Sequence, residues 1–324
     1  MKTIAITGTS GFIGKHLVAE LLRLGNFRIK LLSRNRNRDF NDLIGSGVQI
    51  EITEGDLLEP TSLHGFLEQG CTVVNLVYLR DAGEADNITA VTNLLEACKS
   101  ANVRRLVHCS TAEVVGRVND NLVTESTLCR PITQYGMTKI KIENAILAAA
   151  KAHFDIVLLR PTAVFGPGGM NLEKLTNDLI TKNWLKNYIK SCLFDRRRMN
   201  LVSIANVVAA IIFLINRTEI FNGEIFIVSD DNNPANNFAD VERILMKALN
   251  CPDYFLPRIP VPQSVLRLLL RLLGRNNINP GCNYSQAKLE NLGFNAPVKF
   301  EAGLLEYANW YRSKLFVGQR GDTN

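Results

Sequence analysis

A tyrosine and a lysine four positions apart, Tyr135 and Lys139, are the side chains in this sequence best suited to acid–base chemistry. Four-residue spacing places both on one face of a helix. A free tyrosine has a pKa of about 10, so a neighbouring cation makes its proton available closer to neutral pH. Two hydroxyls, Ser110 and Thr111, end an apolar run about 24 residues earlier. Because such a pair is common by chance, we predict an acid–base site here only together with these hydroxyls.

Three glycines, Gly8, Gly11 and Gly14, follow the first apolar run of the chain at G-x-x-G-x-x-G spacing. Glycine allows a tight turn and a close approach of the backbone to a pyrophosphate. The helix that follows offers unpaired N–H donors and the positive end of its dipole. In this strand–turn–helix context the glycines predict a dinucleotide site rather than a purely structural turn.

The end of the second apolar run, at Ser33 and Arg34, bears on which dinucleotide is bound. An acidic residue here would hold the ribose 2′-hydroxyl of NAD, whereas a guanidinium suits the 2′-phosphate of NADP. The sequence has no acidic residue at this point, so NADP(H) is favoured and NAD(H) is the alternative. The competing interpretation is that Arg34, Arg36 and Arg38 only solubilise a loop. Asp56, after the third run, is expected beside the adenine unless it is a turn carboxylate.

These residues need a scaffold, and the first half of the chain alternates β-branched runs with helical periodicity. This alternation predicts a Rossmann-like α/β fold, a doubly wound parallel sheet with helices on both faces. Strands are expected at residues 3–7, 28–32, 49–53, 73–76, 106–109 and 156–160. Helices are expected at residues 16–24, 63–68, 88–100 and 140–152.

After Pro161 the rhythm changes to a glycine–proline loop and a less regular, more basic region. We therefore expect a smaller, mixed α/β substrate domain interleaved with the first, because residues 205–215 and 225–228 look like a helix and a strand that return to the sheet. The predicted dinucleotide-binding domain comprises residues 1–167 with 200–247. The predicted substrate domain comprises residues 168–199 with 248–324.

Composition excludes several other classes. The 324 residues are 46% hydrophobic and 21% charged, which is typical of a globular protein. The net charge of +6 favours anionic ligands without requiring nucleic acid. Seven scattered cysteines without a C-x-x-C pair predict neither a metal site nor a disulfide framework, so a cytoplasmic location is expected. Neither a signal peptide nor a membrane span is predicted.

Residues 264–275 are predicted to form a helix with one apolar face and one basic face. One stripe of this segment consists of Leu266, Leu269, Leu270 and Leu273, and the other face carries Arg267, Arg271 and Arg275 at four-residue spacing. A packed core face is the preferred interpretation, docking on anionic lipid is the alternative, and Arg275 is also a candidate contact for a nucleotide phosphate.

Taken together, the glycine turn and the Tyr135/Lys139 pair resemble the extended short-chain dehydrogenase/reductases, a family of nucleotide-sugar epimerases, dehydratases and reductases. Residues 87–95 resemble its N-V-x-G-T-x-N-L-L helix, and residues 159–167 resemble its R-P-x-N-V-Y-G-P segment. The resemblance implies that Tyr135 exchanges a proton with the sugar oxygen. It further implies that Lys139 lowers the pKa of Tyr135 and holds the nicotinamide ribose, and that Thr111 binds the reacting oxygen while hydride moves between nicotinamide and sugar.

The same resemblance implies the remaining contacts and a homodimer formed through residues 87–100 and 135–152. Cofactor contacts are expected from Gly8, Ser10, Gly11, Phe12, Ile13, Gly14, Ser33, Arg34, Asp56, Leu57, Leu76, Val77, Asn93, Cys109, Tyr135, Lys139, Pro161 and Val164. Substrate contacts are expected from Tyr78, Thr111, Asn171, Leu172, Arg198 and Arg275.

Some positions depart from the family pattern. The usual Asn is Ala163, and the diphosphate-binding Arg falls on Met199, so either Arg198 takes over or residues 196–198 are a solvated turn. The order of segments after residue 225, together with Asn206 in place of Asp, is similar to bacterial reductases of UDP-4-keto sugars, which make sugars for surface polysaccharides. This implies NADPH-dependent reduction of a UDP-4-keto hexose. The alternatives are a UDP-sugar 4-epimerase with retained NAD and a non-catalytic NADP(H)-binding regulator.

Overall fold

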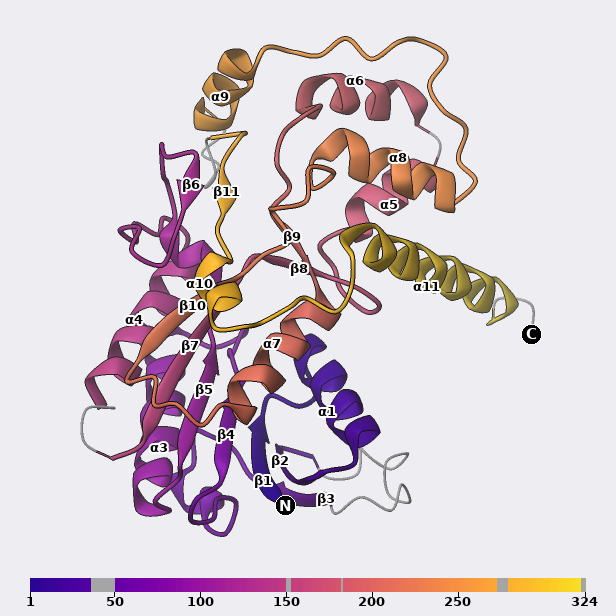
Figure 1. Cartoon of the computed structure of the whole chain (residues 1–324). Helices are drawn as coiled ribbons and strands as arrows, with labels where there is room; N and C mark the ends of the chain where they lie inside the picture. Colours follow the sequence, from indigo (N-terminus) through magenta and orange to yellow (C-terminus); the bar gives the residue numbers. More distant parts are fainter. Residues whose placement is uncertain (36–49, 150–152, 182, 273–278, 322–324) are drawn as a thin grey trace. The chain divides into compact units, whose positions relative to one another are not determined.

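A computed structural model of the chain describes residues 1–35, 50–149, 153–181, 183–272 and 279–321, which form two compact units (Figure 1). Unit 1 consists of Met1–Val114, Pro131–Arg160 and Val208–Phe226. Unit 2 consists of Val115–Arg130, Pro161–Val207 and Ile227–Asn324. The chain passes between the units several times.

Unit 1 is built on a seven-stranded sheet with the order β10-β7-β5-β4-β1-β2-β3. Its strands are β1 (Lys2–Thr7), β2 (Phe27–Ser33), β3 (Ile50–Glu54), β4 (Thr72–Asn75), β5 (Arg105–Cys109), β7 (Asp155–Pro161) and β10 (Glu224–Val228). The pairs from β3 to β7 are parallel. The strand order reverses between β1 and β4, and ligands of open parallel sheets bind outside the carboxyl ends of the strands at such a reversal.

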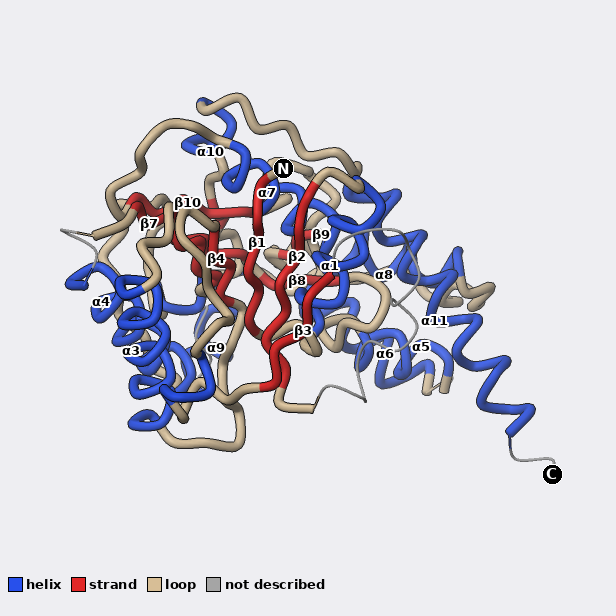
Figure 2. The backbone as a smooth tube through the Cα atoms, turned by 90° about the horizontal axis from the view of Figure 1, so that it is seen from below, coloured by secondary structure: helices blue, strands red, loops and turns tan. Residues whose placement is uncertain are grey.

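Helices cover both faces of this sheet, as predicted from its continuous apolar strands. Helices α3 (Glu84–Ser100) and α4 (Gln134–Ala149) lie on one face, and α1 (Phe12–Leu24) and α7 (Ile204–Asn216) lie on the other (Figure 2). The core between the sheet and the α3–α4 face is aliphatic. It includes Val73, Leu94, Leu106, Ile142, Ile146, Ile156 and Leu158, all buried. This burial on both faces explains why β7 contains the unbroken apolar run 156–159.

The predicted helix at residues 63–68 is wrong. The structure has a short 3-10 helix, η2 (Pro60–Leu63), followed by a turn. Gly65 adopts a φ of 76°, a left-handed conformation that ends any right-handed helix. The apolar spacing of this segment instead brings Leu63 and Phe66 into the core beside α3.

Unit 2 is mixed α/β, with two short parallel sheets and a helical layer. Its strands are β6 (Leu122–Val123), β8 (Ala163–Phe165), β9 (Leu201–Ser203) and β11 (Asn283–Tyr284), which pair as β8-β9 and β6-β11. Its helices are α5 (Glu173–Ile180), α6 (Trp184–Phe194), α8 (Phe238–Ala248), α9 (Gln263–Leu272), α10 (Ala287–Asn291) and α11 (Phe300–Gly321). Its core packs Phe165, Leu201, Leu245, Phe300 and Tyr307 together. Across the described residues of both units, no helix has the length and apolarity to cross a membrane.

Candidate active site

The glycine turn lies at the point where the strand order reverses, between β1 and α1. Gly8 has a φ of 77°, and a Cβ there would lie 2.9 Å from the carbonyl carbon of Leu76. A Cβ on Gly14 would lie 2.3 Å from the carbonyl oxygen of Gly8. Both positions therefore require glycine for close backbone packing. Gly11, the N-cap of α1, makes no side-chain cap hydrogen bond, so the helix N-terminus presents backbone donors that fit a pyrophosphate.

A buried polar chain fixes the neighbouring strand ends. The Asn75 Oδ1 accepts hydrogen bonds from Thr7 Oγ1 at 2.8 Å and from the Val77 N–H at 3.1 Å. Its Nδ2 therefore faces His108 Nδ1, 3.2 Å away, which accepts while the proton resides on Nε2. Burial, with the nearby Lys139 ammonium, holds the pKa of His108 well below 6.5. His108 is thus a neutral residue that ties β1, β4 and β5 together, a role that the isolated histidine did not reveal in the sequence.

Helix α4 brings the predicted acid–base pair to the end of β5. The Lys139 Nζ is buried and donates a hydrogen bond to the Cys109 carbonyl at 3.2 Å. The rings of Tyr135 and Tyr78 meet edge to face with centroids 4.7 Å apart, and Lys139 Nζ lies 5.4 Å from the Tyr78 centroid. Tyr135 also shares a side-chain hydrogen bond with Thr111. The structure therefore gathers Tyr135, Lys139, Thr111 and Tyr78 in one place, all within unit 1.

The pKa of Tyr135 does not shift in the direction that the family resemblance implied. Burial is the largest cause and raises this pKa above 10, and Cys109 and Glu113 raise it further. The hydrogen bond with Thr111 opposes this only in part. Lys139 is itself desolvated, and burial lowers its pKa. The Tyr135 phenol consequently keeps its proton at neutral pH, which suits a proton donor.

The start of α4 is held by residues that sequence reasoning missed. Thr133 Oγ1 donates to Glu113 Oε1 at 2.6 Å and accepts from the Gly136 N–H at 3.1 Å. A Cβ on Gly136 would lie 3.1 Å from the Glu113 carbonyl oxygen, so the helix approaches the segment after β5 very closely. This contact sets Tyr135 beside Thr111. The threonine two residues before Tyr135 was the available signal, because threonine is a helix-capping residue.

Other expected cofactor residues of unit 1 line the same edge of the sheet. Asn93 Nδ2 donates to the Leu57 carbonyl at 2.8 Å, and Asp56 Oδ1 accepts from the Leu58 N–H at 2.9 Å. Ser33 Oγ donates to the Asn35 carbonyl at 3.1 Å, while Arg34 is exposed. The expected contacts Ser10, Phe12 and Ile13 lie in and just before the first turn of α1. The Ser110 Oγ is buried and has no hydrogen-bond partner in the structure.

The expected ligand residues of unit 2 have structural neighbours of their own. Pro161 ends β7, and the carbonyl of Val164 in β8 accepts a hydrogen bond from Asn171 Nδ2 at 2.7 Å. The Leu172 side chain is fully buried in the core. Asn206 is also buried, and its amide bonds Asp230 and the Val298 backbone.

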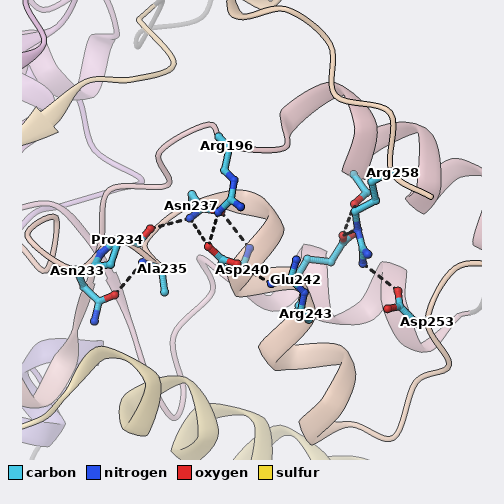
Figure 3. Close-up of polar contacts among 11 residues, drawn as sticks. Arg196, Asn233, Pro234, Ala235, Asn237, Asp240, Glu242, Arg243, Asp253 and Arg258 are labelled. Carbon is cyan, nitrogen blue, oxygen red and sulfur yellow. Dashed lines mark hydrogen bonds and ion pairs between the residues drawn. The ribbon is translucent and has the colours of Figure 1, made fainter.

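Arg198, the proposed replacement for the family's phosphate-binding arginine, is held by its own unit. Its guanidinium donates to Asn283 Oδ1 and to the carbonyls of Asp231 and Asn233. Its neighbour Arg196 pairs with Asp240 at 2.9 Å on the surface (Figure 3). The phosphate role of Arg198 stays a prediction, and Arg275, the other candidate, lies outside the described residues.

Comparisons with known proteins agree with this geometry. A model of the NAD-dependent epimerase/dehydratase family matches residues 4–229. UDP-glucose 4-epimerase from Vibrio cholerae is 27% identical over 330 residues, which cover 95% of this chain and 94% of that protein. Dihydroflavonol 4-reductase from Zea mays is 30% identical over 192 residues, 51% of this chain and 53% of that protein.

Solved structures share the fold. The crystal structure of dTDP-glucose 4,6-dehydratase from Bacillus anthracis in complex with NAD has a TM-score of 0.72 at 19% identity, covering 97% of each chain. Because the family model spans well over half of the sequence, this chain belongs to the NAD-dependent epimerase/dehydratase family and is an enzyme of the extended short-chain dehydrogenase/reductase type.

Proposed function

We propose that the enzyme uses NADPH to reduce the keto group of a UDP-linked 4-keto hexose. The observation that carries this proposal is the end of β2, where the buried Ser33 and the exposed Arg34 stand in the place of a ribose-binding carboxylate. A guanidinium pairs with two phosphate oxygens at once and repels no part of NADPH. A preference for NADP(H) fits net reduction, since an epimerase recycles its nicotinamide and has no use for an external reductant.

The acid–base residues suit the reductive direction. When bound, the reduced nicotinamide supplies a hydride to the carbonyl carbon. Tyr135, which keeps its proton at neutral pH, donates that proton to the carbonyl oxygen, so the ketone becomes an alcohol. The Thr111 hydroxyl binds the same oxygen and positions it next to the phenol. The buried Lys139 provides a cation near the developing phenolate, which stabilises the negative charge as the proton leaves.

The direct test is whether the enzyme consumes NADPH in the presence of UDP-4-keto hexoses. The loss of NADPH absorbance measures the rate, and identification of the sugar product confirms the reaction. Turnover with at least one of these sugars is expected, with little or none when NADH replaces NADPH. Absence of turnover with every UDP-4-keto sugar would exclude the proposal.

Arg34 offers a sharper test of cofactor choice. Replacing Arg34 by glutamine removes a charge-assisted contact to the 2′-phosphate, worth about 1.5–3 kcal/mol. NADPH should therefore bind about 10- to 100-fold more weakly while NADH binding stays the same. Lys99→Gln, an equal change of charge at an exposed position of α3, is the matched control and should alter neither affinity. Equal losses of affinity for NADPH and NADH in the Arg34 variant would show that Arg34 attracts both cofactors non-specifically and does not recognise the 2′-phosphate.

A second candidate function is 4-epimerisation of a UDP-sugar. The similarity to UDP-glucose 4-epimerase from Vibrio cholerae, which extends over nearly the whole of both chains, favours it. This function requires NAD that stays bound through purification and is not consumed. Mass spectrometry of the ligand released from the denatured enzyme, combined with an assay for interconversion of UDP-glucose and UDP-galactose, separates the two candidates.

A further inference from the structure

Residues 251–262, which connect α8 to α9 in unit 2, form an extended strap with an unusual polarity. Two of its polar side chains, Tyr254 and Arg258, are partly buried against the rest of unit 2, whereas large apolar side chains point to solvent. Phe255 is 91% exposed, Ile259 is 69% exposed, and Leu256 is also exposed. Folding ordinarily buries apolar surface first, so this arrangement runs against the usual preference.

Tyr254 and Arg258 anchor the strap to α6 and α8. Arg258 Nε donates to Ser191 Oγ at 2.9 Å, and its Nη2 pairs with Asp253 Oδ1 at 3.0 Å (Figure 3). The Tyr254 hydroxyl donates to Glu242 Oε1 at 2.8 Å. Glu242 is fully buried and also accepts from Ser191 at 2.5 Å. Because the exposed residues lie next to partly buried, hydrogen-bonded ones, their exposure belongs to an ordered segment.

The strap runs along α6 and leads directly into α9. The Tyr188 hydroxyl of α6 donates to the Pro257 carbonyl at 2.8 Å, and the Val261 N–H donates to the Cys192 carbonyl at 3.1 Å. Helix α6 adds its own exposed apolar side chains. These are Trp184, Leu185 and Ile189.

Helix α9 continues the apolar exposure on its outer side. Leu266 and Leu270 are buried, as predicted for the packed stripe, whereas Leu269 of the same predicted stripe is exposed and Leu273 lies outside the described residues. Other apolar side chains of α9 are nevertheless exposed, and Leu272 is the most exposed of them at 74%. They are Val265, Leu268, Leu269 and Leu272. We define the docking surface as the exposed apolar side chains of the strap, of α6 and of α9.

The charges around the docking surface leave a net positive balance, which lies on α9. Helices α6 and α9 carry four basic residues, Lys186, Lys190, Arg267 and Arg271, and no acidic residue. Lys186 and Lys190 share one carboxylate, Asp178, and Arg258 of the strap lies between Asp253 and Glu242, so the arginines of α9 supply most of the positive charge. A surface of leucine, isoleucine, phenylalanine and tryptophan with adjacent Arg and Lys matches the boundary between anionic headgroups and acyl chains. A protein partner would not by itself require this excess of positive charge.

We propose that unit 2 binds the surface of an anionic lipid bilayer through the docking surface. The apolar side chains of the strap, α6 and α9 enter the acyl boundary, and Arg267 and Arg271 of α9 pair with lipid phosphates. Binding is peripheral, and it does not depend on the reaction proposed above.

The test is sedimentation of the full chain with two kinds of vesicle, phosphatidylcholine alone and phosphatidylcholine mixed with phosphatidylglycerol. Binding is expected only to the mixed vesicles, and it should weaken as salt is raised. The double variant Phe255→Ser with Ile259→Ser should reduce binding at least tenfold, because serine has almost no apolar surface to bury among the acyl chains. Arg271→Gln should reduce it about fivefold. Ile220→Ser, which changes an isoleucine of unit 1 that is 70% exposed, is the matched control and should bind as the unaltered chain does.

A second copy of the chain could cover the docking surface instead of lipid. Light scattering without lipid tests this alternative by measuring the oligomeric state. If the unaltered chain is a dimer that the Phe255/Ile259 variant dissociates, and no vesicle binding is seen, the docking surface is an interface between copies and the proposal is wrong. Vesicle binding that is equal in the strap variant and the Ile220 control would also overturn it. Because NADPH turnover is measured separately, failure here leaves the proposed reaction untouched.

Discussion

Replacing Tyr135 by phenylalanine should lower kcat for reduction of the keto sugar by about 10²- to 10⁴-fold, the usual contribution of a general acid. The change removes one oxygen atom and keeps the ring that packs against Tyr78 with a centroid distance of 4.7 Å. The cofactor should therefore still bind with nearly its original affinity. Steady-state kinetics and a fluorescence titration with NADPH measure the two quantities on the same preparation.

The pH dependence gives an independent check on the role of Tyr135. Burial raises the folded-state pKa of this phenol above 10, so the donor form predominates throughout the neutral range and is lost only when the pH rises through that pKa. The rate of reduction should therefore show no fall attributable to Tyr135 between about pH 6 and pH 9. A titration near pH 7 that disappears in Tyr135→Phe would mean that the phenol ionises readily, and would contradict the proposed direction of proton transfer.

Tyr78 is the alternative proton donor, because its phenol ring packs against that of Tyr135. Lys139 Nζ is 5.4 Å from the Tyr78 ring centroid, so this tyrosine also has a cation beside it. If Tyr78→Phe abolishes turnover while Tyr135→Phe retains it, the donor is Tyr78 and the assignment is wrong. A loss in Tyr135→Phe with a much smaller change in Tyr78→Phe supports the assignment.

The sheet and the glycine turn were predictable because they depend on local and periodic signals. Continuous apolar runs identified the buried strands, and the strand–turn–helix context located Gly8 and Gly14. The backbone distances explain why these two positions need glycine, since a Cβ would lie 2.9 Å and 2.3 Å from neighbouring backbone atoms. Helix boundaries were less accurate. The 63–68 helix failed because one glycine with a positive φ outweighs a favourable hydrophobic spacing.

The parts of the site that sequence reasoning missed depend on pairs of residues far apart in the chain. His108 is neutral only because Asn75, on another strand, turns its amide nitrogen toward it. Likewise Thr133 holds the start of α4 through Glu113, 20 residues away. The pKa of Tyr135 follows from burial, which no short motif encodes. Arg198 is a further case, because its place next to Met199 in the family pattern did not indicate that its guanidinium bonds the surrounding backbone carbonyls.

Replacing Arg105 by methionine should lower the free energy of unfolding by about 3–5 kcal/mol, the usual cost of leaving one partner of a buried ion pair alone. The Arg105 guanidinium is almost fully buried and pairs with Asp155 at 2.6 Å. It also donates to the Leu214 carbonyl at 2.6 Å and to the carbonyls of Arg217 and Glu219. Arg105 thus joins β5 to the end of α7 and to the segment before β10, and methionine would leave buried and partly buried acceptors without a donor.

Arg104 is the matched control for this prediction, because it is the adjacent arginine and bonds the same segment. Its Nη2 donates to the Arg217 carbonyl at 2.8 Å, but it is only partly buried and has no carboxylate partner among the described residues. Arg104→Met should therefore cost about 1 kcal/mol in urea denaturation. The loss of unfolding free energy in Arg105→Lys should lie between these two values. An ammonium keeps the charge opposite Asp155 but lacks the planar set of donors that bonds the carbonyls. Equal losses for Arg104→Met and Arg105→Met would show that the ion pair with Asp155 adds nothing beyond an ordinary hydrogen bond.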